Sequence, residues 1–177
     1  MNFIILIIGS YLLGSLPFAM IIAKCHGKDL RNIGSGNIGA TNLARACGKK
    51  WGYFCFILDV AKGMVPMLIG KILITNQTPS VFFLWLAVGF AAVTGHIFPV
   101  YLKFNGGKGV ATSFGVALGL WPYYSICAVF TFIIWVTVVL ITRYVSLASI
   151  IGVVVFPISL VVAIFFNSYW QRASGSH

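Results

Sequence analysis

Long apolar runs recur along the whole chain, and they constrain its fold more than any other feature. Each run has about 20 residues, the length that a helix needs to cross a hydrocarbon core about 30 Å thick. Of the 177 residues, 60% are hydrophobic and 8% are charged, whereas about a quarter of a soluble domain is charged. We therefore expect an all-α, polytopic membrane protein, with a single transmembrane domain over residues 1–177 and lipid around most of the chain.

Six membrane spans are expected, separated by polar stretches. They cover residues 2–23, 51–74, 81–100, 110–120, 123–142 and 150–166. The fourth is too short to cross upright, so we expect a short helix that ends at Trp121-Pro122. Residues 24–50, 75–80 and 101–109 are interpreted as loops. The first run lacks a positively charged start and is longer than the apolar core of a signal peptide, which indicates a retained helix.

The positive charges gather in connections that six spans place on one membrane face. Nine of the twelve Lys and Arg lie in residues 24–50, 101–109 and 143–149, whereas residues 75–80 and Trp121-Pro122 are uncharged. By the positive-inside rule, this face is cytosolic and the N-terminus is outside. Twelve basic residues against two acidic ones could suggest nucleic acid, but no soluble domain remains to bind a duplex. We expect no nucleic-acid partner, and we interpret the basic excess as a topology signal and a surface for an anionic substrate.

The most informative polar stretch combines glycines with hydroxyl and amide side chains. It reads Gly34-Ser-Gly-Asn-Ile-Gly-Ala-Thr-Asn42, with Arg45 three residues later. Glycines let backbone N–H groups approach a ligand, and a guanidinium fork suits phosphate. The predicted phosphate site comprises Gly34, Ser35, Gly36, Asn37, Thr41, Asn42 and Arg45; a flexible linker is the alternative. The glycine spacing also matches a dinucleotide fingerprint, but no βαβ unit fits beside membrane spans.

A second glycine cluster comprises Gly106, Gly107, Lys108 and Gly109. It resembles part of a P-loop, but Gly109 stands where Ser or Thr should follow the lysine, and the upstream glycine is absent. Nucleotide hydrolysis is therefore disfavoured. Backbone N–H groups and one lysine can still bind a phosphate or an acyl phosphate. An ordinary basic turn is the alternative.

Four further polar residues stand out. Asp59 and Lys62 are spaced i, i+3 inside an apolar run, where ionisable groups are paired or functional; they are candidates for a structural ion pair, and a functional role is the alternative. His96 is a candidate general base, or a helix-end histidine that bonds a last carbonyl. Ser146 either caps the sixth span or helps to bind phosphate. Because the chain has only two acidic residues, we expect no metal site and no cofactor.

Five motifs resemble the bacterial acyl-phosphate glycerol-3-phosphate acyltransferases. They are Gly14-Ser15-x-Pro17, residues 31–42, Gly95-His96-x-Phe-Pro-Val100, Phe104-x-Gly-Gly-Lys-Gly-Val-Ala-Thr112 and residues 143–149. The resemblance implies a seven-helix enzyme of the bacterial inner membrane, with its active site toward the cytoplasm. It also implies phosphate-site roles for Ser35 and Arg45, acyl-phosphate contact by residues 106–109, and His96 lining the site. This chain departs from the family after residue 166, because it shows no seventh span and no C-terminal motif, and residues 167–177 are atypical.

The implied reaction transfers a fatty acyl group from acyl phosphate to the sn-1 hydroxyl of glycerol 3-phosphate, giving lysophosphatidic acid and phosphate. The base is either His96 or a phosphate oxygen of the substrate. Membrane lipid surrounds the enzyme; the oligomeric state cannot be read from the sequence, and a monomer is one option. A CDP-alcohol phosphotransferase would need more acids and a metal. A phosphate channel or carrier is the second rival, and it would show inverted repeats and a site at mid-membrane depth.

Overall fold

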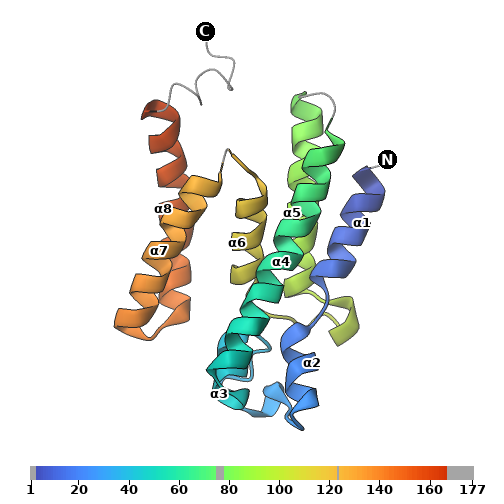
Figure 1. Ribbon diagram of the computed structural model, residues 1–177, viewed down its shortest axis with the longest axis vertical. Helices are drawn as coiled ribbons and strands as arrows, with labels where there is room; N and C mark the ends of the chain where they lie inside the picture. The colour runs from blue at the N-terminus through green and yellow to red at the C-terminus, as the bar shows by residue number, and fades with distance from the viewer. Residues whose placement is uncertain (1–2, 75–77, 123, 167–177) are drawn as a thin grey trace. The chain divides into compact units, whose positions relative to one another are not determined.

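The computed structural model describes residues 3–74, 78–122 and 124–166. These residues form α-helices and two short 3-10 helices, with no strand among them (Figure 1). The all-α class predicted from the sequence is confirmed. The chain divides into two compact units, Met1–Gly119 and Leu120–His177, and each is described by itself. The expectation of one domain stays a prediction.

Within the described residues, four helical segments are long and apolar enough to cross a membrane. They are Phe3–Cys25, Pro79–Leu102, Ser125–Thr142 and Val145–Ala163, and Val110–Gly119 is a shorter apolar helix. The short helix expected before Trp121-Pro122 is therefore found. The count of six spans stays a prediction, and the expected loop at 75–80 and the atypical residues 167–177 lie partly or wholly outside the described residues.

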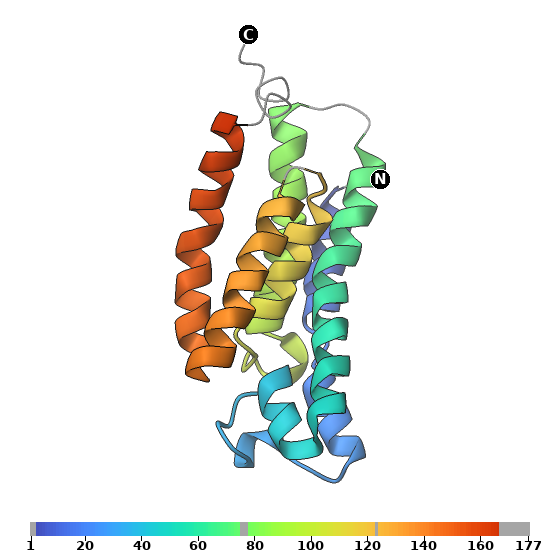
Figure 2. The same cartoon turned by 60° about the vertical axis from the view of Figure 1, so that its left-hand side comes forward.

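The first unit is a bundle around a long central helix. Its elements in chain order are α1 (Phe3–Gly14), α2 (Phe18–Cys25), η1 (Leu30–Asn32), α3 (Ala40–Cys47), α4 (Lys49–Leu73), α5 (Pro79–Ile97), η2 (Val100–Leu102) and α6 (Val110–Gly119). Figures 1 and 2 show α2 and α3 beside the first turns of α4, and the start of α1 toward its last turns. Within this unit, the basic segment and the start of α1 therefore lie at opposite ends.

Small residues let the helices of this unit approach closely. A methyl group added to Gly14 on α1 would overlap the backbone of Ala92 on α5, and one added to Gly63 on α4 would overlap the backbone of Thr112 on α6. Small side chains at helix contacts are a common means of association in membranes, where lipid removes the hydrophobic drive between helices. The contacts α1–α5 and α4–α6 therefore depend on glycine.

The first span expected at residues 2–23 is found as the candidate span Phe3–Cys25, but it is not one continuous helix. Helix α1 ends at Gly14 and α2 begins at Phe18. Pro17 lacks an N–H donor and its ring collides with the preceding turn, and the residue before a proline avoids helical geometry. A break in a membrane helix leaves carbonyls that another group must satisfy. Here the Nζ of Lys62 on α4 donates to the carbonyl oxygen of Leu16, at 3.0 Å.

Two other expected boundaries also differ from the structure. The polar stretch 24–50 is not only loop, because it contains η1 and α3. Helix α3 forms because it is amphipathic: Asn42 and Leu43 are buried, whereas Thr41 and Arg45 are exposed. The helix expected to start at residue 150 begins at Val145, five residues earlier.

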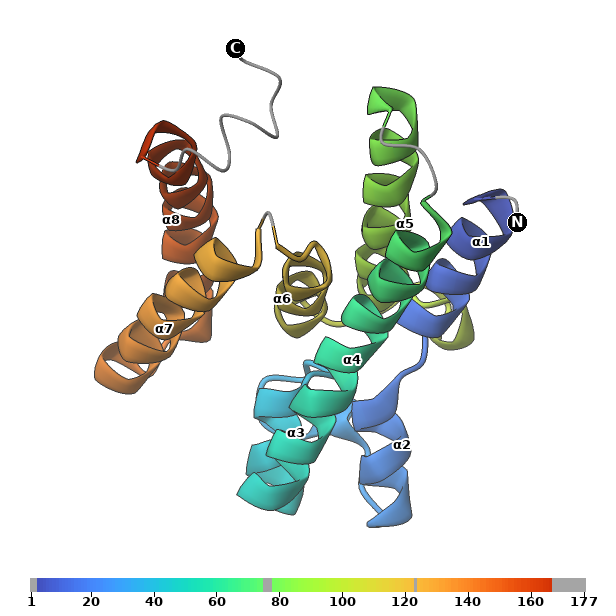
Figure 3. The ribbon, with the colours of Figure 1, turned by 45° about the horizontal axis from the view of Figure 1, so that its top comes forward.

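The second unit contains a pair of adjacent helices, α7 (Ser125–Thr142) and α8 (Val145–Phe166), which lie side by side in Figure 3. Arg143 turns the chain between them in the left-handed region, with φ 63°. The indole Nε1 of Trp135 on α7 donates to the Oγ of Ser149 on α8, at 3.3 Å. This polar contact fixes the register of an otherwise apolar pair.

Candidate functional site

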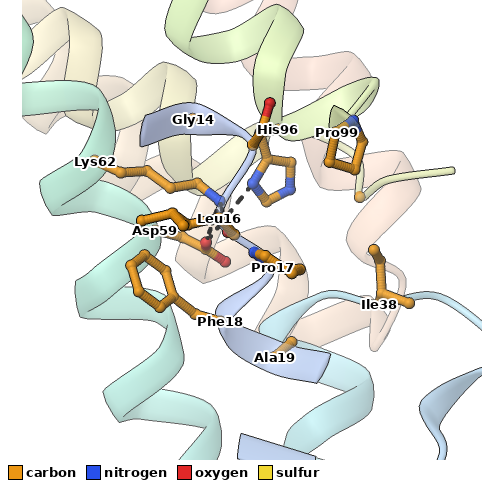
Figure 4. A pocket seen from close by; sticks show the side chains of 12 residues that line it. Gly14, Leu16, Pro17, Phe18, Ala19, Ile38, Asp59, Lys62, His96 and Pro99 are labelled. Carbon is orange, nitrogen blue, oxygen red and sulfur yellow. Dashed lines mark hydrogen bonds and ion pairs between the residues drawn. The ribbon is translucent and has the colours of Figure 1, made fainter. Parts of the chain in front are cut away.

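A pocket opens in the first unit where the break between α1 and α2 meets α4 and the end of α5 (Figure 4). Six of its twelve lining residues come from residues 14–19, which include the break, and the rest come from α4, α5 and the loops. The lining residues are Gly14, Ser15, Leu16, Pro17, Phe18, Ala19, Ile38, Asp59, Lys62, His96, Pro99 and Gly107. The helix break is therefore a major part of the pocket wall.

A buried ion pair forms one side of the pocket. The Nζ of Lys62 lies 2.8 Å from an Oδ of Asp59, and both side chains are at least 95% buried. The same ammonium group donates to the Leu16 carbonyl and lies 5.5 Å from the centre of the Phe18 ring, within the range of a cation–π contact. Lys62 therefore ties α4 to the α1–α2 break.

His96 joins this ion pair from the last turn of α5. Its Nδ1 lies 3.2 Å from the Oγ1 of Thr112, which is hydrogen-bond distance, and 3.6 Å from an Oδ of Asp59, which is too long for a hydrogen bond. The Sγ of Cys55 donates to the other oxygen of Asp59, at 3.6 Å. The Asp59 carboxylate is thus a common contact for side chains from α4 and α5.

The glycine cluster 106–109 folds back onto the end of α5. The N–H of Gly107 donates to the carbonyl oxygen of His96, at 3.1 Å. A methyl group on Gly107 would overlap the His96 ring, and one on Gly106 would overlap the carbonyl oxygens of His96 and Ile97. Among the four residues, only Gly109 has a positive φ, of 77°. The first two glycines are therefore required by close approach.

The buried amide of Asn42 holds the glycine cluster 34–42 together and joins it to the residues just before it. The Nδ2 of Asn42 donates to the carbonyl oxygens of Leu30 and Ile33, at 3.1 and 2.9 Å. Its Oδ1 accepts from the N–H of Ser35, at 3.2 Å. Gly34 and Gly36 both have positive φ, of 59° and 70°. Asn42, expected as a ligand-binding residue, therefore uses its amide to shape the loop.

The predicted site residues do not all line this pocket. The lining includes four of them, His96, Gly107, Asp59 and Lys62. From the first glycine cluster, it includes only Ile38, which was not a predicted site residue. Ser35, Thr41, Arg45 and Lys108 are exposed and are not among the lining residues. Ser146 is the second residue of α8, in the second unit. Binding roles for Gly34, Gly36, Asn37, Gly106 and Gly109 likewise stay predictions.

Sequence reasoning missed Thr112, Cys55 and the Leu16 carbonyl as partners of the buried charges. The spacing of Asp59 and Lys62 gave a signal for the pair on α4, and Pro17 gave a signal for the break. No spacing links residues 59, 96 and 112, which come from three helices. Among the described residues, no group of three or more His, Cys, Asp or Glu side chains is placed to hold a metal ion.

The sequence matches a known enzyme family over nearly its whole length. A model of the family described as glycerol-3-phosphate acyltransferase matches residues 4–173. The glycerol-3-phosphate acyltransferase of Aquifex aeolicus is 47% identical over 152 residues, which are 85% of this chain and 74% of that protein. The enzyme of the same name from Coxiella burnetii is 46% identical over 164 residues, 92% of this chain and 81% of that protein.

Two solved structures share the fold. One is PlsY (YgiH), an integral membrane glycerol 3-phosphate acyltransferase, in its glycerol 3-phosphate form; it has a TM-score of 0.83 at 42% identity and covers 98% of this chain and 83% of its own. The other is the lysophosphatidic acid form, with a TM-score of 0.78 at 41% identity, covering 96% and 79%. These similarities indicate an integral membrane protein.

Proposed function

Because the chain belongs to the glycerol-3-phosphate acyltransferase family, we propose that it transfers a fatty acyl group from acyl phosphate to the sn-1 hydroxyl of glycerol 3-phosphate. The family predicted from the sequence is confirmed, and the chain is a membrane acyltransferase. The donor, the reacting hydroxyl and the residues that hold them are the proposed part. The relatives include structures of a glycerol 3-phosphate form and a lysophosphatidic acid form, which correspond to one substrate and the product of this reaction.

The reaction needs no covalent intermediate on the protein. The hydroxyl oxygen attacks the carbonyl carbon, the bond from that carbon to the phosphate oxygen breaks, and the hydroxyl proton passes to a base. Lysophosphatidic acid and inorganic phosphate are the products. Because phosphate is a good leaving group, positioning and donors aimed at the developing negative charge can supply the catalysis.

The observation that carries the proposal is that both glycine clusters border one pocket. Cluster 34–42 contributes Ile38 and cluster 106–109 contributes Gly107. Two phosphate-bearing substrates need two sets of phosphate donors within reach of each other, and glycine-rich backbone with nearby cations provides such donors. We assign Ser35 and Arg45 to one phosphate and the backbone of residues 106–109, with Lys108, to the other.

We place this site at the cytoplasmic side of the bacterial inner membrane. Segments 24–50 and 101–109, which are rich in basic residues, contribute Ile38 and Gly107 to the pocket lining, and positive charge marks the cytoplasmic face. Both substrates are anionic, so the same charges would raise their local concentration. Family membership supports an acyltransferase, whereas it gives no support to a phosphate channel or carrier.

The test is acyl transfer by the purified protein in lipid vesicles. Labelled glycerol 3-phosphate and an acyl phosphate should give labelled lysophosphatidic acid and one phosphate per product. An acyl thioester offered in place of acyl phosphate should give none. The rate should be unchanged by EDTA, because positioning and cationic side chains hold the phosphates. Absence of product, or loss of activity on chelation that magnesium restores, would overturn the proposal; restoration by magnesium would favour phosphotransfer.

A further inference from the structure

We propose that His96 is a positioning residue, whose ring is fixed by Asp59 and Thr112 and supports the backbone of residues 106–109. This inference rests on the proposed function, because it concerns how the site holds one of its phosphates. It assigns the proton of the attacking hydroxyl to a base other than His96. In this proposal, the buried Asp59–Lys62 pair acts in the reaction by holding the His96 ring in place.

Both nitrogens of the His96 ring face other parts of the protein. Nδ1 lies 3.2 Å from the Oγ1 of Thr112. Nε2 faces Gly107 so closely that a methyl group on that glycine would overlap it. The side chain is 8% exposed. A general base must come within about 3 Å of the proton that it takes, and the Gly107 backbone occupies that side of the ring.

The ring is held from α4 through a chain of buried contacts. Lys62 donates to the Leu16 carbonyl at 3.0 Å and pairs with Asp59 at 2.8 Å. Asp59 in turn lies 3.6 Å from Nδ1 of His96. Figure 4 shows these side chains converging from the two helices and the α1–α2 break. Because buried charges are costly to leave unpaired, this chain of contacts resists displacement of the ring.

The loop rests on the ring and on the backbone beside it. The N–H of Gly107 donates to the His96 carbonyl at 3.1 Å, and Gly106 lies against the carbonyls of His96 and Ile97. Lys108 and Gly109 follow directly, so their positions depend on this contact. A misplacement of about 1 Å can cost about 100-fold in rate. Loss of the support should therefore weaken substrate binding by the loop.

The ring and Gly107 should be energetically coupled, and a double-mutant cycle measures the coupling. Gly107→Ala adds a methyl group that the ring obstructs, and we expect at least about a tenfold loss of kcat/KM, since overpacking a tight contact distorts its surroundings. His96→Ala in the same chain removes the obstruction, so the double variant should be at least about threefold more active than Gly107→Ala alone. If the double variant is no more active than Gly107→Ala, the inference is overturned.

Gly9→Ala is the matched control for the added methyl group. Gly9 lies in α1, and nothing lies within 4 Å of a Cβ placed there. Its kcat/KM should equal that of the parent. All variants are compared in the same vesicle assay, so an inactive parent would sink the proposed function, whereas an active parent without coupling would sink the inference alone.

His96→Gln keeps the bulk of the side chain and removes its basicity, so it decides the question even if Gly107→Ala does not purify. As a positioning residue, His96 should tolerate this change with a kcat within about fivefold of the parent and a raised KM for the phosphate that residues 106–109 bind. A base would instead show a fall of at least about 100-fold in kcat with unchanged KM. That second result would overturn the inference.

Discussion

The two glycine clusters look alike in the sequence and are built in different ways. In residues 34–42, Gly34 and Gly36 take positive φ angles, and Asn42 bonds to Ser35 within the loop and to the carbonyls of Leu30 and Ile33 just before it. In residues 106–109, Gly106 and Gly107 are pressed against the end of α5. The first loop is shaped by its own residues, whereas the second is shaped by a neighbour.

The difference shows that a glycine-rich motif has more than one physical cause. A positive φ excludes most side chains by local backbone geometry. Close approach excludes them because another group already fills the space. Only the exclusion by close approach can be relieved by a change elsewhere in the chain. Mutations at the glycines and at their neighbours can therefore test the difference.

Gly106→Ala should have the largest effect. Its methyl group would meet the carbonyl oxygens of His96 and Ile97, which are backbone atoms, so the loop itself must move. We expect a loss of at least about 100-fold in kcat/KM. Unlike Gly107→Ala, this loss should persist when His96 is also replaced by Ala. Rescue by that second change would contradict the contact described here, and the vesicle acyl-transfer assay measures both variants.

Arg45→Lys tests the exposed side of the first loop. Lys keeps the charge but lacks the planar fork that grips a phosphate through two parallel bonds. We expect at least about a tenfold fall in the initial rate at low glycerol 3-phosphate, with normal insertion and purification. Lys49→Ala, on the exposed first residue of α4, is the control and should be nearly silent. Parent-like kinetics for Arg45→Lys would leave Arg45 as a topology charge only.

Asn42→Ala tests whether the first loop is shaped from within. The change removes the partner of the Leu30 and Ile33 carbonyls and of the Ser35 N–H. Buried groups left unsatisfied should lower the free energy of unfolding by about 1–3 kcal/mol, a fall in Tm of about 3 °C or more. Thermal unfolding in detergent measures it. Asn32→Ala, at an exposed position on η1, should change Tm much less; equal shifts would remove Asn42 from this role.

Asp29→Asn should have the smallest effect, because the Asp29 carboxylate, which caps η1 ahead of the first loop, is partly exposed. The hydrogen bond from the Arg31 side chain lowers the pKa of Asp29 to about 2, from an ordinary 3.8. The folded state therefore binds this proton less readily than the unfolded state, so the stabilisation is present above about pH 4 and is lost as the pH falls toward 2.

Thermal unfolding of parent and Asp29→Asn across this range measures the loss. The parent should exceed the variant in Tm by less than about 2 °C at neutral pH, and the difference should vanish near pH 2. Adding Arg31→Gln to Asp29→Asn should change little more, since the pair is already broken. A difference that grows as the pH falls would contradict the assigned pair.

The sequence predicted the class of fold because repeated apolar runs of about 20 residues indicate membrane-spanning helices. It did not predict the break at Leu16–Pro17, because one proline in an apolar run of this length is compatible with a kinked but continuous helix. Helix α3 was missed because its eight residues are too few for periodicity to stand out among polar neighbours. Both features depend on packing against α4, which supplies Lys62 to the break.

The candidate site was predictable in kind but not in arrangement. Glycine, arginine and lysine in short motifs indicated phosphate chemistry, and family resemblance gave the reaction. The meeting of Asp59, His96 and Thr112 follows from the packing of α4, α5 and α6, which no local pattern encodes. For the same reason, the sequence could not tell which glycines turn the backbone and which make room for a ring.

The most direct test of this distinction compares Asn with Ala at one glycine from each cluster. Gly36 has a positive φ, and the nearest obstacle to a Cβ there is 3.3 Å away; Asn tolerates that conformation better than Ala. Gly107 is limited by space, so the larger Asn should be worse than Ala. We predict that kcat/KM ranks Gly36→Asn above Gly36→Ala, but Gly107→Asn below Gly107→Ala. The same ranking at both positions would contradict the account.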